Sequence, residues 1–285
     1  MGIAYRFPLR GWIKAQLSAF DVLEITVDHF LSCDAAERAA MVDLVGRVPM
    51  TAHGIGLSIG TDTPIDLAYL DRVATVLERI KAPAYSEHLA FTRVPGRELG
   101  NLLPLPRTKA VAETVIEKIR LIQSRLSVPF LLENIAQVFE WPDAELSDAQ
   151  FMTFICRESG AGILLDVENL HLNARNHGLD AYGFLDALPP GIVKEVHVAG
   201  GLGLNDKLAK RRFYADSHSH PVRAASFDLL EYALERQSPR TVVLERDERF
   251  DAVDEILRDV KRIRTRIENR REKITHVEPA PGSAD

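Results

Sequence analysis

Short runs of apolar and β-branched residues recur along the chain, separated by segments in which apolar residues repeat with helical spacing. The runs fall at residues 3–7, 21–25, 48–53, 83–88, 129–134, 161–166, 193–198 and 241–246. Their near-continuous apolarity is typical of strands covered on both faces. The clearest helical segments span residues 67–80, 108–126, 148–159, 227–236 and 253–267. Thr108 is placed as an N-cap, and Gly160 stands where a left-handed residue ends a helix.

Strands that alternate with helices predict a parallel sheet, and eight of them predict an α/β fold of the (β/α)₈ TIM-barrel type in a single domain. An open doubly wound sheet is the alternative, but no glycine-rich phosphate loop follows an early strand. We expect the barrel to span residues 1–270 and residues 271–285 to form a charged, disordered tail. Three connections after strands are long and predict loops over the barrel mouth: 89–107, 167–178 and 199–223.

Composition narrows the class of protein. The net charge of −6 argues against a nucleic-acid partner. Cys33 and Cys156 have neither metal-site nor redox spacing, so no disulfide framework is expected. No apolar run is long enough to span a membrane, and the N-terminus lacks the pattern of a signal peptide. We therefore expect a cytoplasmic protein with no membrane partner.

The candidate chemistry lies at the ends of the predicted strands. Six consecutive strands end with, or close to, a histidine or carboxylate: His53, His88, Glu133, Asp166, His197 and Glu245. The connections that follow add Asn169, His171 and His177 after the sixth strand, and Asp216, His218 and His220 after the seventh. In a barrel of this type the C-terminal ends of the strands form one rim, so we expect these residues to converge.

Each of these residues alone has an ordinary interpretation, as a hydrogen-bonded structural histidine or a carboxylate that caps the next helix. Together they are harder to explain without a cation, because crowded carboxylates repel one another strongly. Imidazoles mixed with carboxylates form a donor set that suits iron, manganese or zinc. The number of donors exceeds the needs of one ion, so the sequence predicts a site for two or three metal ions.

At these positions the chain resembles a known family, the multinuclear non-haem iron-dependent oxidative enzymes (MbnB/TglH-like, formerly an uncharacterised family), which includes enzymes of methanobactin and 3-thiaglutamate biosynthesis. The similar segments are HGIGLSIG (53–60), SEHLAF (86–91), LLPLP (102–106), LLEN (131–134), GILLDVENLHLNARNHG (162–178), VHVAGG (196–201), DSHSHPV (216–222) and LERD (244–247). Two departures stand out: members often carry DTHD where this chain has DSHS, and they lack a counterpart of His171.

The resemblance implies an oxidoreductase that uses two or three iron ions and O₂ to oxidise a cysteine of a ribosomally made precursor peptide, in natural-product (RiPP) biosynthesis. It also implies a small separate partner that binds the leader peptide. The family's ligand set would fall on His53, His88, Glu133, Asp166, Asn169, His197, Asp216, His218 and Glu245, with Asp216 and His218 also serving catalysis. Asp216 and His218 are two residues apart, so in an extended segment both can face one ion.

Three other functions fit a metal-binding barrel. A sugar isomerase or epimerase would use two divalent ions bridged by carboxylates such as Glu133, Asp166 and Glu245. A phosphodiesterase of the endonuclease IV type would hold zinc, but the acidic balance disfavours a nucleic-acid substrate. A noncatalytic metal-binding scaffold is the third. The identity of the metal separates them: iron with oxygen consumption, manganese or magnesium with isomerisation, zinc with hydrolysis.

Overall fold

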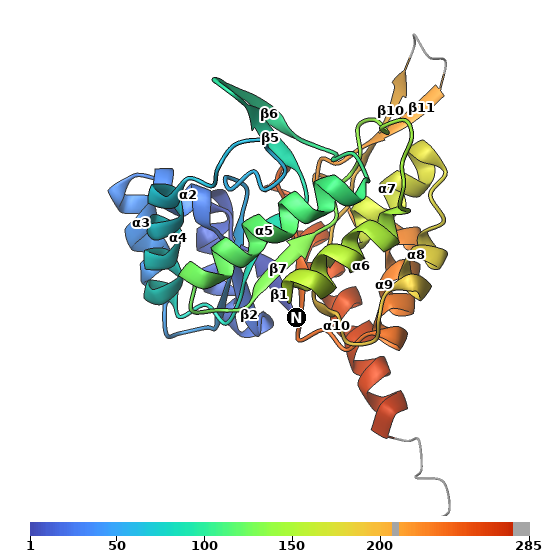
Figure 1. The fold of residues 1–285 in the computed structure, drawn as a ribbon. Coiled ribbons are helices and arrows are strands. Elements are labelled where there is room, and N and C mark those ends of the chain that lie inside the picture. Colours follow the sequence, from blue (N-terminus) through green and yellow to red (C-terminus); the bar gives the residue numbers. More distant parts are fainter. Residues whose placement is uncertain (207–210, 276–285) are drawn as a thin grey trace, which may run out of the picture.

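The computed structural model describes residues 1–206 and 211–275 and shows a closed barrel of eight parallel strands, in the order β1-β12-β9-β8-β7-β4-β3-β2 (Figure 1). The strands are β1 (Gly2–Ala4), β2 (Val22–Thr26), β3 (Met50–Gly54), β4 (Tyr85–His88), β7 (Phe130–Glu133), β8 (Gly162–Asp166), β9 (Val193–Val198) and β12 (Thr241–Leu244). Each overlaps one of the eight runs predicted from the sequence. The (β/α)₈ prediction is confirmed.

Helices surround the barrel (Figure 1). They are α1 (Arg10–Ala15), α2 (Val27–Ser32), α3 (Ala35–Val42), α4 (Leu67–Ile80), α5 (Lys109–Arg125), α6 (Asp148–Ser159), α7 (Val167–His177), α8 (Ala181–Ala187), α9 (Ala224–Arg236) and α10 (Val253–Thr275), with short 3-10 turns at Phe7–Leu9 and Leu17–Ala19. The predicted caps are present: the Thr108 side chain accepts from Val111 N, and Gly160 ends α6 in the left-handed region. Helix α10 runs five residues past the boundary expected at residue 270.

Two of the three long connections contain antiparallel hairpins. Strands β5 (Phe91–Val94) and β6 (Arg97–Leu103) pair after β4, and β10 (Leu202–Asp206) pairs with β11 (Arg211–Ala215) after β9. Both hairpins project from the same end of the barrel, the end at which the strands terminate (Figure 1). They therefore stand over the mouth where the predicted site residues lie.

The third connection, residues 167–178, was wrongly predicted to be a loop. It is helix α7, which begins directly after β8 because the Asp166 side chain accepts a hydrogen bond from Asn169 N. Leu170 and Leu172 of this helix are buried, but its polar residues hide the helical periodicity. Its last residue is followed by Gly178 in the left-handed region, a common way for a helix to end.

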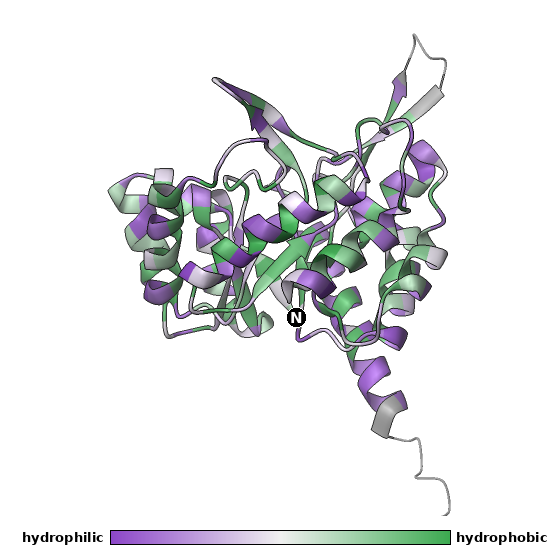
Figure 2. Ribbon diagram, viewed as in Figure 1, coloured by the Kyte–Doolittle hydropathy of each residue, from purple (hydrophilic) through white to green (hydrophobic). Residues whose placement is uncertain are grey.

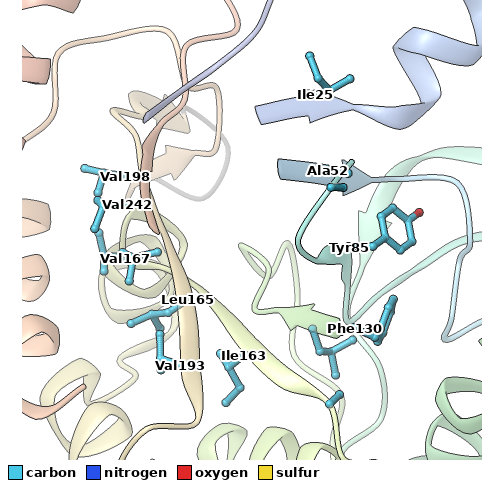
Figure 3. Packing of buried hydrophobic residues seen from close by; sticks show 14 of the residues in the cluster. Ile25, Ala52, Tyr85, Phe130, Ile163, Leu165, Val167, Val193, Val198 and Val242 are labelled. Atoms are coloured by element: carbon cyan, nitrogen blue, oxygen red, sulfur yellow. The ribbon is translucent and has the colours of Figure 1, made fainter. Parts of the chain in front are cut away.

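The main apolar core lies between the barrel and its helices rather than inside the barrel. Outward side chains such as Ile25, Leu165 and Val198 pack in this layer, part of which Figure 3 shows. The hydropathy colouring shows the same division, since the helices carry hydrophilic residues on their outer sides (Figure 2). Among the described residues, no helix is both long and apolar enough to cross a membrane.

Candidate metal centre

The inner face of the barrel is unusually polar towards its C-terminal end. Side chains two residues apart on a strand share a face, so six of the strands each place two side chains inside the barrel, one in a layer at the strand end and one in the layer below it. These inward pairs are Glu24 and Thr26, Thr51 and His53, Ser86 and His88, Leu131 and Glu133, Leu164 and Asp166, and Glu195 and His197. Most of these side chains are buried. The polar groups therefore depend on one another, or on a bound cation, to offset their desolvation.

His53, His88 and Glu133 form a compact triangle at the ends of β3, β4 and β7. The two Nε2 atoms are 3.3 Å apart, and each lies 3.3 Å from Glu133 Oε2. Ligands that share an ion at about 2.1 Å are separated by about 3.4 Å in a tetrahedral site and about 3 Å in an octahedral one. The Nδ1 atoms contact Ser86 Oγ and Gly54 O, at 2.8 and 3.1 Å. These contacts orient both rings towards the triangle.

A second group of donors shares Glu133 with the first. It consists of Glu133, Asp166, His197 and Glu245, whose ligand atoms lie within 4.8 Å of one another. His197 Nδ1 is 3.4 Å from Glu133 Oε1 and 3.2 Å from Glu245 Oε2. Glu133 thus turns one oxygen to each group, an arrangement in which a carboxylate can bridge two metal ions.

Asp216 and His218 approach the same place from the connection after β9. His218 Nε2 lies 2.6 Å from Asp216 Oδ1, and His218 Nδ1 lies 3.4 Å from Glu245 Oε2. The backbone of His218 has a φ of 45°, which is costly for a residue with a Cβ and is often found at functional sites. Hydrogen bonds from Asp247 N to His218 O and from Arg246 Nη1 to Ser219 O hold the segment in this conformation.

Asn169 and Asp166 are linked through Asn134, which follows Glu133. The Asn134 side chain exchanges two hydrogen bonds of 2.9 Å with the backbone of Asp166, and Asn169 Nδ2 donates to Asn134 O. Asn169 Oδ1 and Asp166 Oδ2 have no hydrogen bonds and are buried. Burial raises the pKa of Asp166 well above its ordinary value, so a cation is needed to keep this carboxylate charged at neutral pH.

The residues present fit a metal group. Five buried donor atoms of the sequence-predicted set have no hydrogen bond: Glu133 Oε2, Asp166 Oδ2, Asn169 Oδ1, His197 Nδ1 and His218 Nε2. Several lie at ion-pair distances from charged neighbours but without hydrogen-bond geometry. Buried polar atoms are rarely left without partners, and a shared metal ion is the partner that this mixture of nitrogen and oxygen donors suits.

The protonation of the triangle shows what a metal ion would displace. Burial lowers the pKa of His53 to about 3. Burial also disfavours protonation of His88, but the carboxylates of Glu133 and Glu87 outweigh it and raise its pKa to about 9. Burial opposes ionisation of Glu133, yet the neighbouring imidazoles, His88 first, lower its pKa to about 2. His88 therefore carries a proton in the metal-free protein.

Sequence reasoning missed two buried carboxylates beneath the centre. Glu24 Oε2 lies 2.8 Å from His197 Nε2, and Glu195 Oε2 accepts from Thr51 Oγ1 at 3.3 Å. Glu24, Glu195 and His197 form a third group with metal-ligand spacing. A charged residue in the middle of an apolar strand is rarely buried without a purpose, and this was the signal available in both strands.

The residues at the rim are arranged differently from the sequence interpretation in one respect. From sequence alone, Arg246 and Asp247 could hold a ligand carboxylate or pair with each other, and their adjacency favours pairing. Instead Arg246 is buried 3.5 Å from Asp259, while Asp247 accepts from Arg6 Nε at 2.5 Å. The two side chains therefore point to different partners. Arg6 also lies 3.2 Å from Glu245 Oε1, which leaves Glu245 Oε2 towards His197 and His218.

The other candidate histidines lie away from the donor groups. His177 Nε2 is 2.6 Å from Gln137 O, and His220 Nδ1 is 2.6 Å from Ser219 Oγ. The ring of His171 packs edge-on against Tyr214, with 6.3 Å between centroids. His29 lines a cavity beside the mouth. His276 lies outside the described residues.

The sequence matches the profile of one family along nearly its whole length. Residues 1–268 match the family described as "RiPP precursor modification enzyme MbnB/TglH/ChrH". A UPF0276 protein of Acaryochloris marina is 31% identical over 264 residues, 93% of each chain. One of Bordetella pertussis is 34% identical over 240 residues, 84% of this chain and 83% of the other.

One relative is much longer than this chain. A UPF0276 protein of Streptomyces avermitilis is 36% identical over 228 residues, 78% of this chain. The match covers only 46% of that protein, so the chain spans about half of its length.

Solved structures with the same fold share little sequence. D-psicose 3-epimerase of Clostridium cellulolyticum H10 has a TM-score of 0.55 at 14% identity, covering 97% of this chain and 98% of its own. D-allulose 3-epimerase of Methylomonas sp. has a TM-score of 0.59 at 13% identity, covering 93% and 96%. These similarities establish the barrel fold alone.

Proposed function

This chain belongs to the MbnB/TglH/ChrH family of RiPP precursor modification enzymes, and we propose that it is an iron- and O₂-dependent oxidoreductase that modifies a cysteine of a ribosomally made precursor peptide. The observation that carries the proposal is Glu133, whose two oxygens face two different groups of donors. A carboxylate shared in this way supports a multinuclear centre rather than a single ion. Histidine with carboxylate donors is a set that suits iron.

In this proposal each residue has a defined task. His53, His88 and Glu133 would hold one ion, and Glu133, Asp166, Asn169, His197 and Glu245 a second. Asp216 and His218 would complete the site from above, where a third ion is possible. Bound iron would supply the redox chemistry with O₂ and deprotonate a substrate thiol on coordination.

The protein's own contribution would be to orient donors and leave one side open. Ser86 and Gly54 O fix the two imidazoles of the triangle, and Arg6 holds one oxygen of Glu245. Asp216 lines the larger cavity at the mouth, which gives substrate direct access to the side of the centre that Asp216 and His218 form. This is why we assign catalysis to these two residues. A separate small protein that binds the leader peptide completes the proposal.

The test begins with the metal. Protein produced with sufficient iron and purified without oxygen should hold roughly two or three iron ions per chain, with Mössbauer spectra of a coupled centre. It should consume O₂ with a mass change in a cysteine-containing precursor peptide. Manganese or magnesium with sugar epimerisation, or zinc with phosphodiester hydrolysis, would overturn the proposal.

Two single histidine variants test the segment that carries Asp216 and His218. His218→Ala should remain folded but lose iron and all peptide oxidation. His171→Ala, which removes a half-buried imidazole packed on Tyr214 at the same rim, should retain both. If His218→Ala keeps full iron and full turnover, Asp216 and His218 are not part of the centre.

A further inference from the structure

Two cavities open at the mouth on opposite sides of the candidate centre. The larger, of about 790 Å³, lies between the β5–β6 hairpin and β11 and ends at Asp216. The smaller, of about 640 Å³, lies over the ends of β1, β2 and β12 and is lined by Arg6 and Asp247. Ile55 lines both. The two cavities therefore adjoin at Ile55, and we refer to them as the two arms of a trough across the mouth.

The candidate centre contacts both arms through His218. His218 contacts Asp216 of the larger arm at 2.6 Å and Asp247 of the smaller arm at 3.3 Å. Each arm alone has the volume of a complete small-molecule site. A sugar, or the last residue of a chain, would fill one arm and leave the other without a ligand.

The charges of the two arms also bear on the substrate. Among the described side chains that line them, the carboxylates are Glu37, Glu98, Asp216 and Asp247. Both arginines are already engaged: Arg6 by Asp247 and Glu245, and Arg93 by the carbonyls of Gly56 and Leu57. A free terminal carboxylate would therefore find no unengaged arginine among the described residues that line either arm.

Resting on the proposed function, we infer that the substrate peptide crosses the trough, so that the modified residue is internal, with chain held in both arms. The alternative is a residue at the C-terminus of the peptide, held in one arm. An internal residue needs no such arginine, because the backbone on either side of it is uncharged.

Two displayed peptide libraries test this inference on the full-length, iron-loaded protein without oxygen. One carries a fixed cysteine with about five randomised residues on each side, enough to extend about 16 Å each way. The other has the same length but ends at the cysteine with a free carboxylate. We expect the protein to retain the internal-cysteine library at least about tenfold better. Equal or better retention of the terminal library would overturn the inference, and so would retention of neither library. The proposed function is judged separately, by iron content and by the O₂-dependent mass change of the precursor peptide.

Substitutions that fill one arm sharpen the test. Asn101→Trp fills the larger arm and Ser32→Trp the smaller, and both positions are exposed and outside the donor groups. Each should reduce retention of the internal-cysteine library by about tenfold with unchanged iron content. Ser124→Trp is the control, because Ser124 is likewise exposed near a helix end but lies on α5, away from both arms. If filling either arm leaves retention unchanged, the chain does not occupy that arm and the inference is wrong.

Discussion

Glu24 lies directly behind a candidate ligand and is placed to control it. Its Oε2 is 2.8 Å from His197 Nε2, and the Nδ1 atom of the same ring faces Glu133 and Glu245. A carboxylate that accepts from one ring nitrogen fixes the tautomer and makes the other nitrogen a stronger metal donor. Glu24 therefore belongs to the centre although it faces no open space.

Glu24→Gln keeps the volume of the side chain and removes its charge, so we expect metal affinity to fall by about 10- to 100-fold with the fold retained. Titration of the metal-free protein with Fe²⁺ measures the change. Asp259→Asn is the matched control, since Asp259 is a buried carboxylate that pairs with Arg246 and lies in none of the described donor groups. If both variants bind metal like the wild type, Glu24 is only a structural residue.

The proton on His88 predicts how metal binding depends on pH. The pKa of His88 is raised to about 9 by Glu133 and Glu87, against the effect of burial. A metal ion must displace this proton, and protons on other ligands add to the effect, so affinity should rise by at least about tenfold per pH unit below pH 9. Fe²⁺ or Co²⁺ titrations between pH 6 and 9 measure the slope. A flat profile in this range would show that His88 is not a ligand.

At the scale of elements, the strands could be predicted from the sequence and much of the mouth could not. Strands buried on both faces require apolar runs, which stand out in any chain. Helix α7 was missed because its start depends on the Asp166 side chain and its exposed positions are polar. The two hairpins lie outside the apolar core, so no burial pattern marks them.

The same reasoning explains which site residues were predicted. Parallel strands in a barrel end at one rim, so the convergence of His53, His88 and Glu133 followed from topology. Which oxygen of Glu133 faces which group depends on side-chain rotation, and that leaves no trace in sequence. Glu24 and Glu195 were hidden by their place one layer below the strand ends. The resemblance to the MbnB/TglH family is confirmed by the profile match over residues 1–268.

Asn134 tests how much the hydrogen bonds between the ends of β7 and β8 contribute to stability. Its side chain makes two buried hydrogen bonds with the backbone of Asp166, and its backbone carbonyl accepts from the side-chain amide of Asn169. Asn134→Ala leaves the Asp166 N–H and C=O without these partners, which should lower the free energy of unfolding by about 2–4 kcal/mol. Urea denaturation of the metal-free protein measures the loss without a contribution from metal. A loss below about 0.5 kcal/mol would show that water replaces the amide.

At the scale of the whole molecule, the interior of the barrel is polar, whereas the layer around it is apolar. The apolar core surrounds the barrel, whereas the inside holds carboxylates and imidazoles with unsatisfied atoms. A ligand that binds only the folded chain stabilises it by mass action. The metal-loaded protein should therefore be markedly more stable than the metal-free one.

Chelation with EDTA should lower the free energy of unfolding by about 2.7 kcal/mol for each ion bound, relative to protein kept at a hundredfold excess of Fe²⁺ over its Kd. Differential scanning calorimetry under anaerobic conditions measures this through the Tm. Glu133→Ala, which removes the carboxylate shared by both donor groups, should respond much less to the chelator. An equal response in both proteins would place the stabilising metal elsewhere.

Asp166 has two roles, as the N-cap of α7 and as a candidate metal ligand, and the two roles have different chemical requirements. One oxygen caps α7 through Asn169 N, and the other lies bare at the centre. Asparagine would cap the helix as well but brings no charge to a metal ion, while glutamate brings the charge but is a poor cap. Helix α7 in turn holds β11 through Asn176, whose amide bonds the backbone of Tyr214, next to the segment that carries Asp216. Among the genetically encoded residues, aspartate alone meets both requirements. A substitution at this position therefore alters the position of β11 as well as metal binding, and its effect cannot be interpreted as the loss of a ligand only.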